Sequence, residues 1–361
     1  MFKRILIANR GEIAVRVIRA CQELGVEAVA IYSDADKNAL HVQLADLTYR
    51  VGPADAAESY LNKEAVLEAA IQTKSEAIHP GYGFLSEDAD FAEMVTKAGI
   101  VWIGPMPETL RLVGDKDAAR AAMAPSGIPM SKGSAPLENN EMALKAAEEV
   151  GYPVILKPVS GGGGKGMFVA HSEEDLKNIL QLVDLKKVVH YFEHYIEHSR
   201  HIEAQILADN YGTVLFLGER ECSLQRRNQK LLEESPSVAL TEEMRREIGR
   251  LAIKAAKSVH YSNAGTVEFL LDLADNKFYF MEINPRVQVE HAITEAVTGV
   301  ARSRSPTVSL WGSCRRISRS AVTPSSAAST PKIPTTTSCR PPVSSPSCTS
   351  RAVRAYASIA A

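Results

Sequence analysis

The sequence predicts an α/β protein in which a parallel sheet comes first and an antiparallel sheet follows. Up to Gly104, short apolar runs alternate with helix-forming stretches, which is the pattern of a parallel sheet covered by helices. Between residues 202 and 283, four strand-like runs accompany one amphipathic helix, which favours an antiparallel sheet. The chain has 361 residues, 45% of them hydrophobic, and this is enough to build more than one core.

The parallel sheet begins with an apolar strand, a polar turn and a helix. The pattern G-x-G-x-x-G does not follow this first strand, so the sequence predicts the architecture of a dinucleotide-binding fold without its fingerprint. Later strands and helices alternate in the same way. We expect strands at residues 5–8, 26–32, 77–78 and 101–104, and helices at residues 13–24, 63–73 and 89–97.

A second unit is expected to begin with the helix after Asp115 and to end near Ile202. It contains two strand-like runs, at residues 154–156 and 167–170, on either side of a glycine-rich loop. The third unit holds the antiparallel sheet. We expect its strands at residues 202–207, 214–218, 265–271 and 278–283, and its helix at residues 242–258.

Charge divides the chain near Val300. The last 61 residues carry 9 of the 41 lysines and arginines and none of the 43 acidic residues, so the formal charge of −2 combines −11 before Val300 with +9 after it. These 61 residues also contain 15 serines and 7 prolines without an apolar period, so we expect a disordered tail. The acidic body argues against nucleic-acid binding by its one basic run, residues 223–230.

Cysteine content and hydropathy predict a soluble cytoplasmic protein without a membrane partner. Before Val300 the only cysteines are Cys21 and Cys222, which is no disulfide framework and suits a reducing compartment. The apolar run at residues 5–8 is too short for a signal sequence or a membrane span.

Four consecutive glycines, residues 161–164, form a candidate phosphate loop. Because glycine has no Cβ, the backbone N–H groups of such a loop can approach a phosphate closely. The loop is not a Walker A motif, since Val159 stands where a glycine is required. A glycine run is also typical of a flexible linker, but its place between two strands favours a cradle. Lys116 and Lys157 are candidate phosphate partners, with solvated surface charge as the alternative.

Two acidic strands carry candidate metal ligands. Glu282 and Asn284 are two residues apart in an expected strand, so their side chains share one face and offer oxygen ligands suited to Mg²⁺. Glu268 is a second carboxylate within an apolar strand, where a buried charge needs a partner or a metal. Pairing of both glutamates with lysine or arginine on an edge face explains the pattern equally well.

The segment after these strands carries a candidate oxyanion site. Arg286, Gln288 and Glu290 alternate, so their side chains project from one side if the segment is extended. A guanidinium and an amide would hold a small planar oxyanion, and the carboxylate would supply a base beside it.

Five runs of the chain resemble biotin carboxylase, an ATP-grasp enzyme. They read IANRGEIA at residues 7–14, HPGYGFLSE at 79–87, GDK at 114–116, ERECSLQRR at 219–227 and EINPRVQVEH at 282–291. The resemblance extends over essentially all of residues 1–300. It implies that ATP and bicarbonate form carboxyphosphate, and that CO₂ passes to N1 of biotin on a carrier protein. The chain would then be an ATP-dependent ligase that forms a carbon–nitrogen bond.

The resemblance also implies a role for individual residues. Lys230, Arg286 and Glu290 would be catalytic, with Glu290 as the general base. Bicarbonate would be bound by Lys230, Arg286, Gln288 and Val289, and two Mg²⁺ or Mn²⁺ ions by Glu268, Glu282 and Asn284. ATP would be bound by Lys116, Lys157, Gly163, Gly164, Glu193, His194, Ile196, His201, Gln225 and Asn228.

The family's organisation implies two domains before Val300. Residues 1–113 would form a Rossmann-like domain and residues 114–300 the ATP-grasp domain, with a mobile glycine-rich lid over about 132–203 and a catalytic sheet over about 204–300. The chain has no Met-Lys-Met biotinylation site, so biotin is expected on a separate biotin carboxyl carrier protein that also serves a carboxyltransferase subunit. The acyl acceptor, acetyl-CoA, propionyl-CoA or pyruvate, is left open.

The tail, residues 301–361, departs from the family. Read one register away, residues 325–334 permit the sequence AIECRINAEDP, residues 340–345 permit PSPGII and residues 350–359 permit LPGGPGVRID. These are motifs of the family's C-terminal domain in their usual order. We therefore interpret the tail as a frameshift near the codon of Val300, which resequencing of the DNA tests directly.

The frameshift removes an arginine that the family uses toward biotin, together with the domain that completes the site and much of the dimer contact. We therefore expect impaired carboxylation, a weakened homodimer and exposed apolar surface. Two alternative functions remain open. One is a different ATP-grasp ligase that joins a carboxylate to an amine, and the other is an inactive nucleotide-binding remnant.

Overall fold

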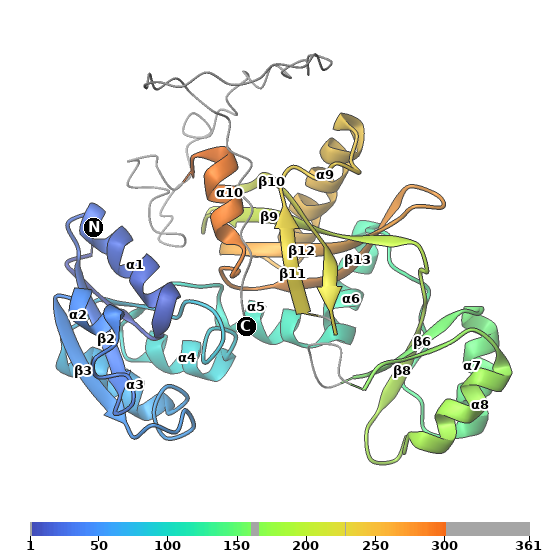
Figure 1. Ribbon diagram of the computed structural model, residues 1–361, viewed down its shortest axis with the longest axis horizontal. Helices are drawn as coiled ribbons and strands as arrows, with labels where there is room; N and C mark the ends of the chain where they lie inside the picture. Colours follow the sequence, from blue (N-terminus) through green and yellow to red (C-terminus); the bar gives the residue numbers. More distant parts are fainter. Residues whose placement is uncertain (1, 160–165, 228, 301–361) are drawn as a thin grey trace, which may run out of the picture.

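A computed structural model describes residues 2–159, 166–227 and 229–300 (Figure 1). The predicted tail and most of the glycine-rich loop lie outside this part of the chain. The described residues form three units, each with its own sheet, and Figure 1 places the antiparallel sheet between the other two. The predicted α/β class and the order of parallel before antiparallel strands are confirmed.

The N-terminal unit is a five-stranded parallel sheet with helices on both faces. Its strand order is β3-β2-β1-β4-β5. Successive side chains of β1 point to opposite faces, so Ile5 and Ile7 pack with α1 while Leu6 packs with α3 and α4. The strands are β1 Arg4–Ile7, β2 Glu27–Ser33, β3 Leu47–Gly52, β4 Ala77–His79 and β5 Val101–Trp102. The helices are α1 Gly11–Glu23, α2 Leu40–Leu44, α3 Lys63–Gln72, α4 Ala89–Lys97 and α5 Pro107–Gly114.

The second unit is a small three-stranded antiparallel sheet packed against two helices. In it β6 is central, between β7 and β8. Its separate core includes Leu156, Leu176 and Phe192. The unit follows α6 Lys116–Met123 and a 3₁₀ turn at Ala124–Ser126. Its elements are α7 Asn140–Val150, β6 Val154–Pro158, β7 Phe168–Ala170, α8 Glu173–Leu182 and β8 His190–His194.

The third unit is a five-stranded antiparallel sheet in the order β11-β10-β9-β12-β13. Its apolar face packs against α9, and Ile202, Val267 and Phe280 contribute to this core. The opposite face is therefore free to carry polar side chains. The strands are β9 Ser199–Ala208, β10 Val214–Arg226, β11 Gln229–Glu234, β12 Asn263–Asp272 and β13 Lys277–Asn284, and the helices are α9 Glu242–Ser258 and α10 His291–Thr298.

The start of α9 is fixed by its N-cap, Thr241. The backbone of Thr241 is extended and its hydroxyl accepts a hydrogen bond from the N–H of Met244. We expect Thr241→Ala to lower the free energy of unfolding by about 1 kcal/mol, because this N–H loses its partner. Urea denaturation measures the change. Thr241→Ser keeps the hydroxyl and is the matched control, so equal losses in both variants would contradict the cap.

Contacts across the first and third units fix the segment between β13 and α10. Val287, in this segment, packs into the core between the parallel sheet and α1. Arg16 of α1 lies 2.8 Å from Glu295 of α10. The loop that leads into α10 is therefore held from both sides. In the described part of the chain, none of the helices combines the length and the apolar character of a membrane span.

Candidate functional site

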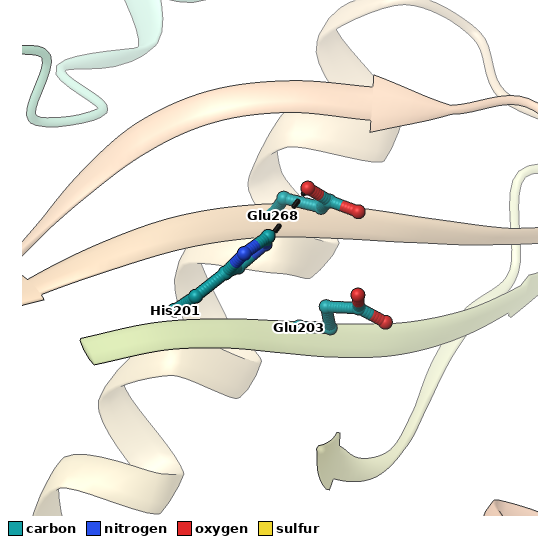
Figure 2. A group of neighbouring side chains, drawn as sticks. All are labelled: His201, Glu203 and Glu268. Carbon is teal, nitrogen blue, oxygen red and sulfur yellow. Dashed lines mark hydrogen bonds and ion pairs between the residues drawn. The ribbon is translucent and has the colours of Figure 1, made fainter. Parts of the chain in front are cut away.

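The candidate site lies on the face of the antiparallel sheet that α9 leaves free. Side chains at alternate positions of β9 point to this face, and Glu268 joins them from the neighbouring β12. Figure 2 shows His201 and Glu203 of β9 beside Glu268 of β12, with a helix behind the strands. The ligand atoms of these three side chains all lie within 4.8 Å of one another. Acidic groups at such distances need cations close by.

Lys230 of β11 is the cation at the centre of this face. Its Nζ donates to Glu290 at 2.8 Å, to Glu268 at 3.1 Å and also to Glu203. The three carboxylates are almost fully buried, with side-chain exposures of 4%, 5% and 0%. An ammonium group has three donors, so all of them are used. Burial opposes the charge of Lys230, but Glu268 and Glu290 outweigh it and raise its pKa.

Glu268 is held in its ionised form by the groups around it. Its carboxylate lies 2.8 Å from Nε2 of His201 and accepts from Nδ2 of Asn284 at 2.7 Å. Burial acts to raise the pKa of Glu268, but His201 and Lys230 outweigh it and lower the pKa to about 2. Glu268 thus pairs with a lysine, as one interpretation of the sequence expected, and it also contacts Asn284, a residue of the predicted metal site.

Glu282 lies opposite Glu268 on the paired strands β13 and β12. Burial and the charge of Glu268 raise the pKa of Glu282. Carboxylate and amide oxygens are hard ligands, so two close carboxylates beside the amide side chain of Asn284 suit Mg²⁺ or Mn²⁺. The predicted metal residues are thus brought together by the register of the two strands. Both oxygens of the neighbouring Glu203 accept from the cationic side chains of Arg220 and Lys230.

The predicted oxyanion residues lie in the segment between β13 and α10. Because β13 ends at Asn284, these residues do not alternate along a strand as an extended segment would. Arg286 instead donates to the amide oxygen of Gln288 at 2.9 Å and also pairs with Glu87. The Nε2 atom of Gln288 is buried and has no hydrogen-bond partner among the described residues. The loop therefore contains a buried amide donor at Gln288, while Val289 is 38% exposed.

Glu290 occupies the N-cap position of α10, immediately before the first helical residue. It is 6% exposed and faces Lys230. Burial acts to raise the pKa of Glu290, but the charges of Lys230 and Arg220 outweigh it and lower the pKa. The carboxylate is therefore ionised at neutral pH and able to accept a proton.

Predicted ATP residues form two groups on separate sheets. On the antiparallel sheet, Nε2 of Gln225 lies 2.8 Å from Nδ1 of His201. On the small sheet, Lys157 donates to Glu193 at 3.0 Å, and Arg120 lies 3.5 Å from the same carboxylate. Burial acts to raise the pKa of Glu193, but these two cations lower it.

The remaining predicted ATP residues are more dispersed. The ring of His194 lies 2.9 Å from the carbonyl oxygen of Gly151, and Ile196 is 7% exposed. Lys116 is the first residue of α6 and is close enough to Glu282 to favour its ionised form. Three further predicted residues, Gly163, Gly164 and Asn228, lie outside the described part of the chain.

Sequence reasoning missed three charged residues of this region. Glu203 is fully buried between Arg220 and Lys230, and Glu87 pairs with Arg286. The alternation of polar and apolar residues along β9 could have identified Glu203. Arg220 and Glu87 lie within the runs that resemble the family, but neither had a role assigned.

Comparison with known proteins supports one assignment over nearly the whole described chain. Residues 1–110 match the family model of the biotin carboxylase N-terminal domain, and residues 115–302 match that of the ATP-binding domain of the carbamoyl-phosphate synthase L chain. Biotin carboxylase 1 of Bacillus subtilis is 53% identical over 306 residues, which cover 83% of this chain and 68% of that protein. A biotin carboxylase of Allochromatium vinosum is 52% identical over 308 residues, with the same coverage.

Solved structures give the same result. A biotin carboxylase from Campylobacter jejuni in complex with ATP superposes with a TM-score of 0.79 at 46% identity, covering 83% of this chain and 69% of that one. The biotin carboxylase domain dimer of 2-oxoglutarate carboxylase from Hydrogenobacter thermophilus, solved with MgADP, ADP and bicarbonate, has a TM-score of 0.79 at 43% identity, covering 89% and 72%. The chain therefore belongs to the biotin carboxylase family of ATP-dependent ligases.

Proposed function

We propose that this chain uses ATP to activate bicarbonate and transfers its carboxyl group to biotin on a separate carrier protein. The observation that carries the proposal is a continuous set of contacts. Lys230 donates to Glu290 and Glu268, Asn284 also donates to Glu268, and Arg286, which holds Gln288, donates to Asn284 at 3.4 Å. A base, two cations and an amide with a free donor suit the binding and deprotonation of a small oxyanion.

In the proposed reaction, Arg286 and the free amide N–H of Gln288 hold bicarbonate, with Lys230 and the segment at Val289 beside it. Glu290 takes the proton of bicarbonate. The deprotonated oxygen of bicarbonate then attacks the γ-phosphorus of ATP. The bond between the γ-phosphorus and the β-phosphate oxygen breaks, and carboxyphosphate and ADP form. Carboxyphosphate then releases CO₂ and phosphate, the phosphate takes the proton of N1 of biotin, and N1 attacks CO₂ to form carboxybiotin.

Glu268, Glu282 and Asn284 fit a divalent metal, because they bring two carboxylates and an amide side chain to one place. When bound, Mg²⁺ or Mn²⁺ would neutralise charge on the phosphates of ATP. His201 and Gln225 lie next to this set and would line the nucleotide.

ATP is proposed to lie between the small sheet and the antiparallel sheet. Lys116 and Lys157 would bind phosphates, together with Gly163 and Gly164, and the segment of Glu193, His194 and Ile196 would meet the adenine. Lys157 donates to Glu193, and its remaining N–H donors could bind a phosphate beside this carboxylate. Asn228 is also expected to contact the nucleotide.

We propose a domain division at residues 113 and 114, with a lid preceding the catalytic sheet. The expected lid boundary near residue 203 falls inside β9, which begins at Ser199 and belongs to the antiparallel sheet. The proposed partners are a biotin carboxyl carrier protein, a carboxyltransferase subunit and a second copy of the chain, in the cytoplasm. A rice relative at 47% identity is the alpha subunit of methylcrotonoyl-CoA carboxylase.

The proposal is tested by measuring ATP hydrolysis with and without bicarbonate and free biotin. We expect hydrolysis that depends on bicarbonate. A ligase for other substrates would require a different carboxylate and an amine instead, and an inactive remnant would bind ATP without any stimulation.

The proposed frameshift after Val300 is tested with a second chain. A matched chain in which the reading register is restored after Val300 should hydrolyse ATP faster than the present chain and carboxylate free biotin. Equal rates in the two chains would contradict an impairing frameshift.

A further inference from the structure

Arg220 of β10 is a fully buried arginine whose donors are all used. Its Nε and Nη2 donate to Oε2 of Glu203 at 3.2 and 2.8 Å. Its Nη1 donates to Gln205 at 2.7 Å and to the hydroxyl of Thr294 at 2.8 Å, and Nη2 also reaches the hydroxyl of Thr266 at 3.1 Å. A guanidinium has five N–H donors, so none is left over. Such a buried charge is costly unless its surroundings compensate it, as they do here.

The first consequence of this network concerns Glu203. One oxygen of its carboxylate accepts from Arg220 and the other accepts from Lys230. Both Nε and Nη2 of Arg220 donate to Oε2, and Lys230 donates to Oε1, so the two cations together fix the orientation of the carboxylate. Glu203 therefore transmits the position of Arg220 to Nζ of Lys230, which also contacts Glu290.

The second consequence concerns α10. Thr294 is one turn after Glu290 in this helix and is 1% exposed. Its hydrogen bond with Arg220 joins the first turn of α10 to the centre of the antiparallel sheet. Arg220 is thereby connected to Lys230 through Glu203, and to Glu290 through Thr294 of α10.

We propose that Arg220 is a positioning residue that sets the distance between the ammonium of Lys230 and the carboxylate of Glu290. This inference rests on the proposed function, in which that pair binds and deprotonates bicarbonate. Arg220 itself contacts neither of the two groups by a hydrogen bond among the described residues. Its effect should therefore appear in the constants for bicarbonate and spare those for ATP.

Arg220→Lys is the main test, because it keeps the charge and loses the fork. An ammonium group cannot serve Glu203 and Thr294 in the same geometry. We expect kcat/KM for bicarbonate to fall by about 10- to 100-fold and KM for ATP to stay within about twofold. Binding of ¹³C-labelled bicarbonate, followed by NMR on the same proteins, gives a second readout that does not depend on turnover.

Arg245→Gln is the matched control. Arg245 donates to Glu219 at 2.8 Å, directly before Arg220 on β10, and has no contact with Lys230 or Glu290 among the described residues. We expect it to lower the midpoint of thermal unfolding and to leave the bicarbonate constants unchanged. Thr294→Val removes only the tie to α10 and replaces Arg220→Lys if that variant does not fold. Its expected effect is a loss of about threefold or more in kcat.

The outcomes separate the inference from the function on which it rests. Unchanged bicarbonate constants in folded Arg220→Lys, or in Thr294→Val if it must stand in, overturn the positioning role. Parallel losses in Arg220→Lys and Arg245→Gln also overturn it, since they would indicate a general loss of stability. A parent chain that neither binds nor uses bicarbonate overturns the proposed function, and the inference with it.

Discussion

Replacing Glu290 with glutamine is expected to lower bicarbonate-dependent ATP hydrolysis by about 10²- to 10⁴-fold, the contribution typical of a positioned general base. The amide has the size of the carboxylate but cannot accept the proton of bicarbonate. Steady-state rates at saturating ATP measure the effect. The carboxylate is suited to this role because Lys230 and Arg220 keep its pKa low despite its burial, and it is therefore ionised at neutral pH.

Glu295→Gln provides the control for this experiment, because it makes the same chemical change further along α10. Glu295 pairs with Arg16 at 2.8 Å and makes no contact with Lys230 among the described residues. We expect its hydrolysis rate to match that of the parent chain. A Glu290→Gln variant that keeps more than about a third of the parent rate would show that the proton goes elsewhere.

Apolar periodicity predicted most of the fold. The helix over residues 242–258 and the helix over residues 89–97 have the predicted bounds, since each has an apolar face and a side-chain cap at its N-terminus. Three strands were missed: β3, β8 and β11. Polar residues interrupt the apolar pattern of these three segments. The segments are strands chiefly because neighbouring strands supply hydrogen bonds. Intrinsic strand propensity is a weak predictor where pairing with a neighbouring strand decides whether a segment is extended.

The candidate site could be predicted only in part. Glu282 and Asn284 are two residues apart, so their common face followed from the period of a strand. The contact between Lys230 and Glu290 spans 60 positions, and no local pattern shows it. The hydrogen bonds of Arg220 join residues up to 74 positions apart. Predicting them requires the register of β10, β9 and β12 and the position of α10 relative to the sheet. The alternation of residues 286–290 already indicated Glu290, family resemblance supplied Lys230, and Arg220 required the geometry.

Lys230→Met is expected to lower the free energy of unfolding by about 3–5 kcal/mol, because removing one partner leaves uncompensated charges in a buried site. Methionine keeps the apolar length of the lysine stem, so the main loss is the charge. Three carboxylates, those of Glu203, Glu268 and Glu290, would then face one another without their shared cation. Urea denaturation measures the loss. Lys277→Met is the control, since the side chain of Lys277 is 65% exposed and pairs at the surface with Asp275. We expect it to change stability by less than about 0.5 kcal/mol.

A double variant separates charge repulsion from lost packing. If the instability of Lys230→Met comes from facing carboxylates, adding Glu290→Gln removes one of the three charges and restores part of the stability. If it comes from the packing of the lysine stem, the second substitution restores nothing and the two effects add. We expect recovery of about 1 kcal/mol or more, the usual size of coupling between groups in direct contact. Simple additivity, or equal losses for Lys230→Met and Lys277→Met, would mean that Lys230 does not hold these carboxylates together.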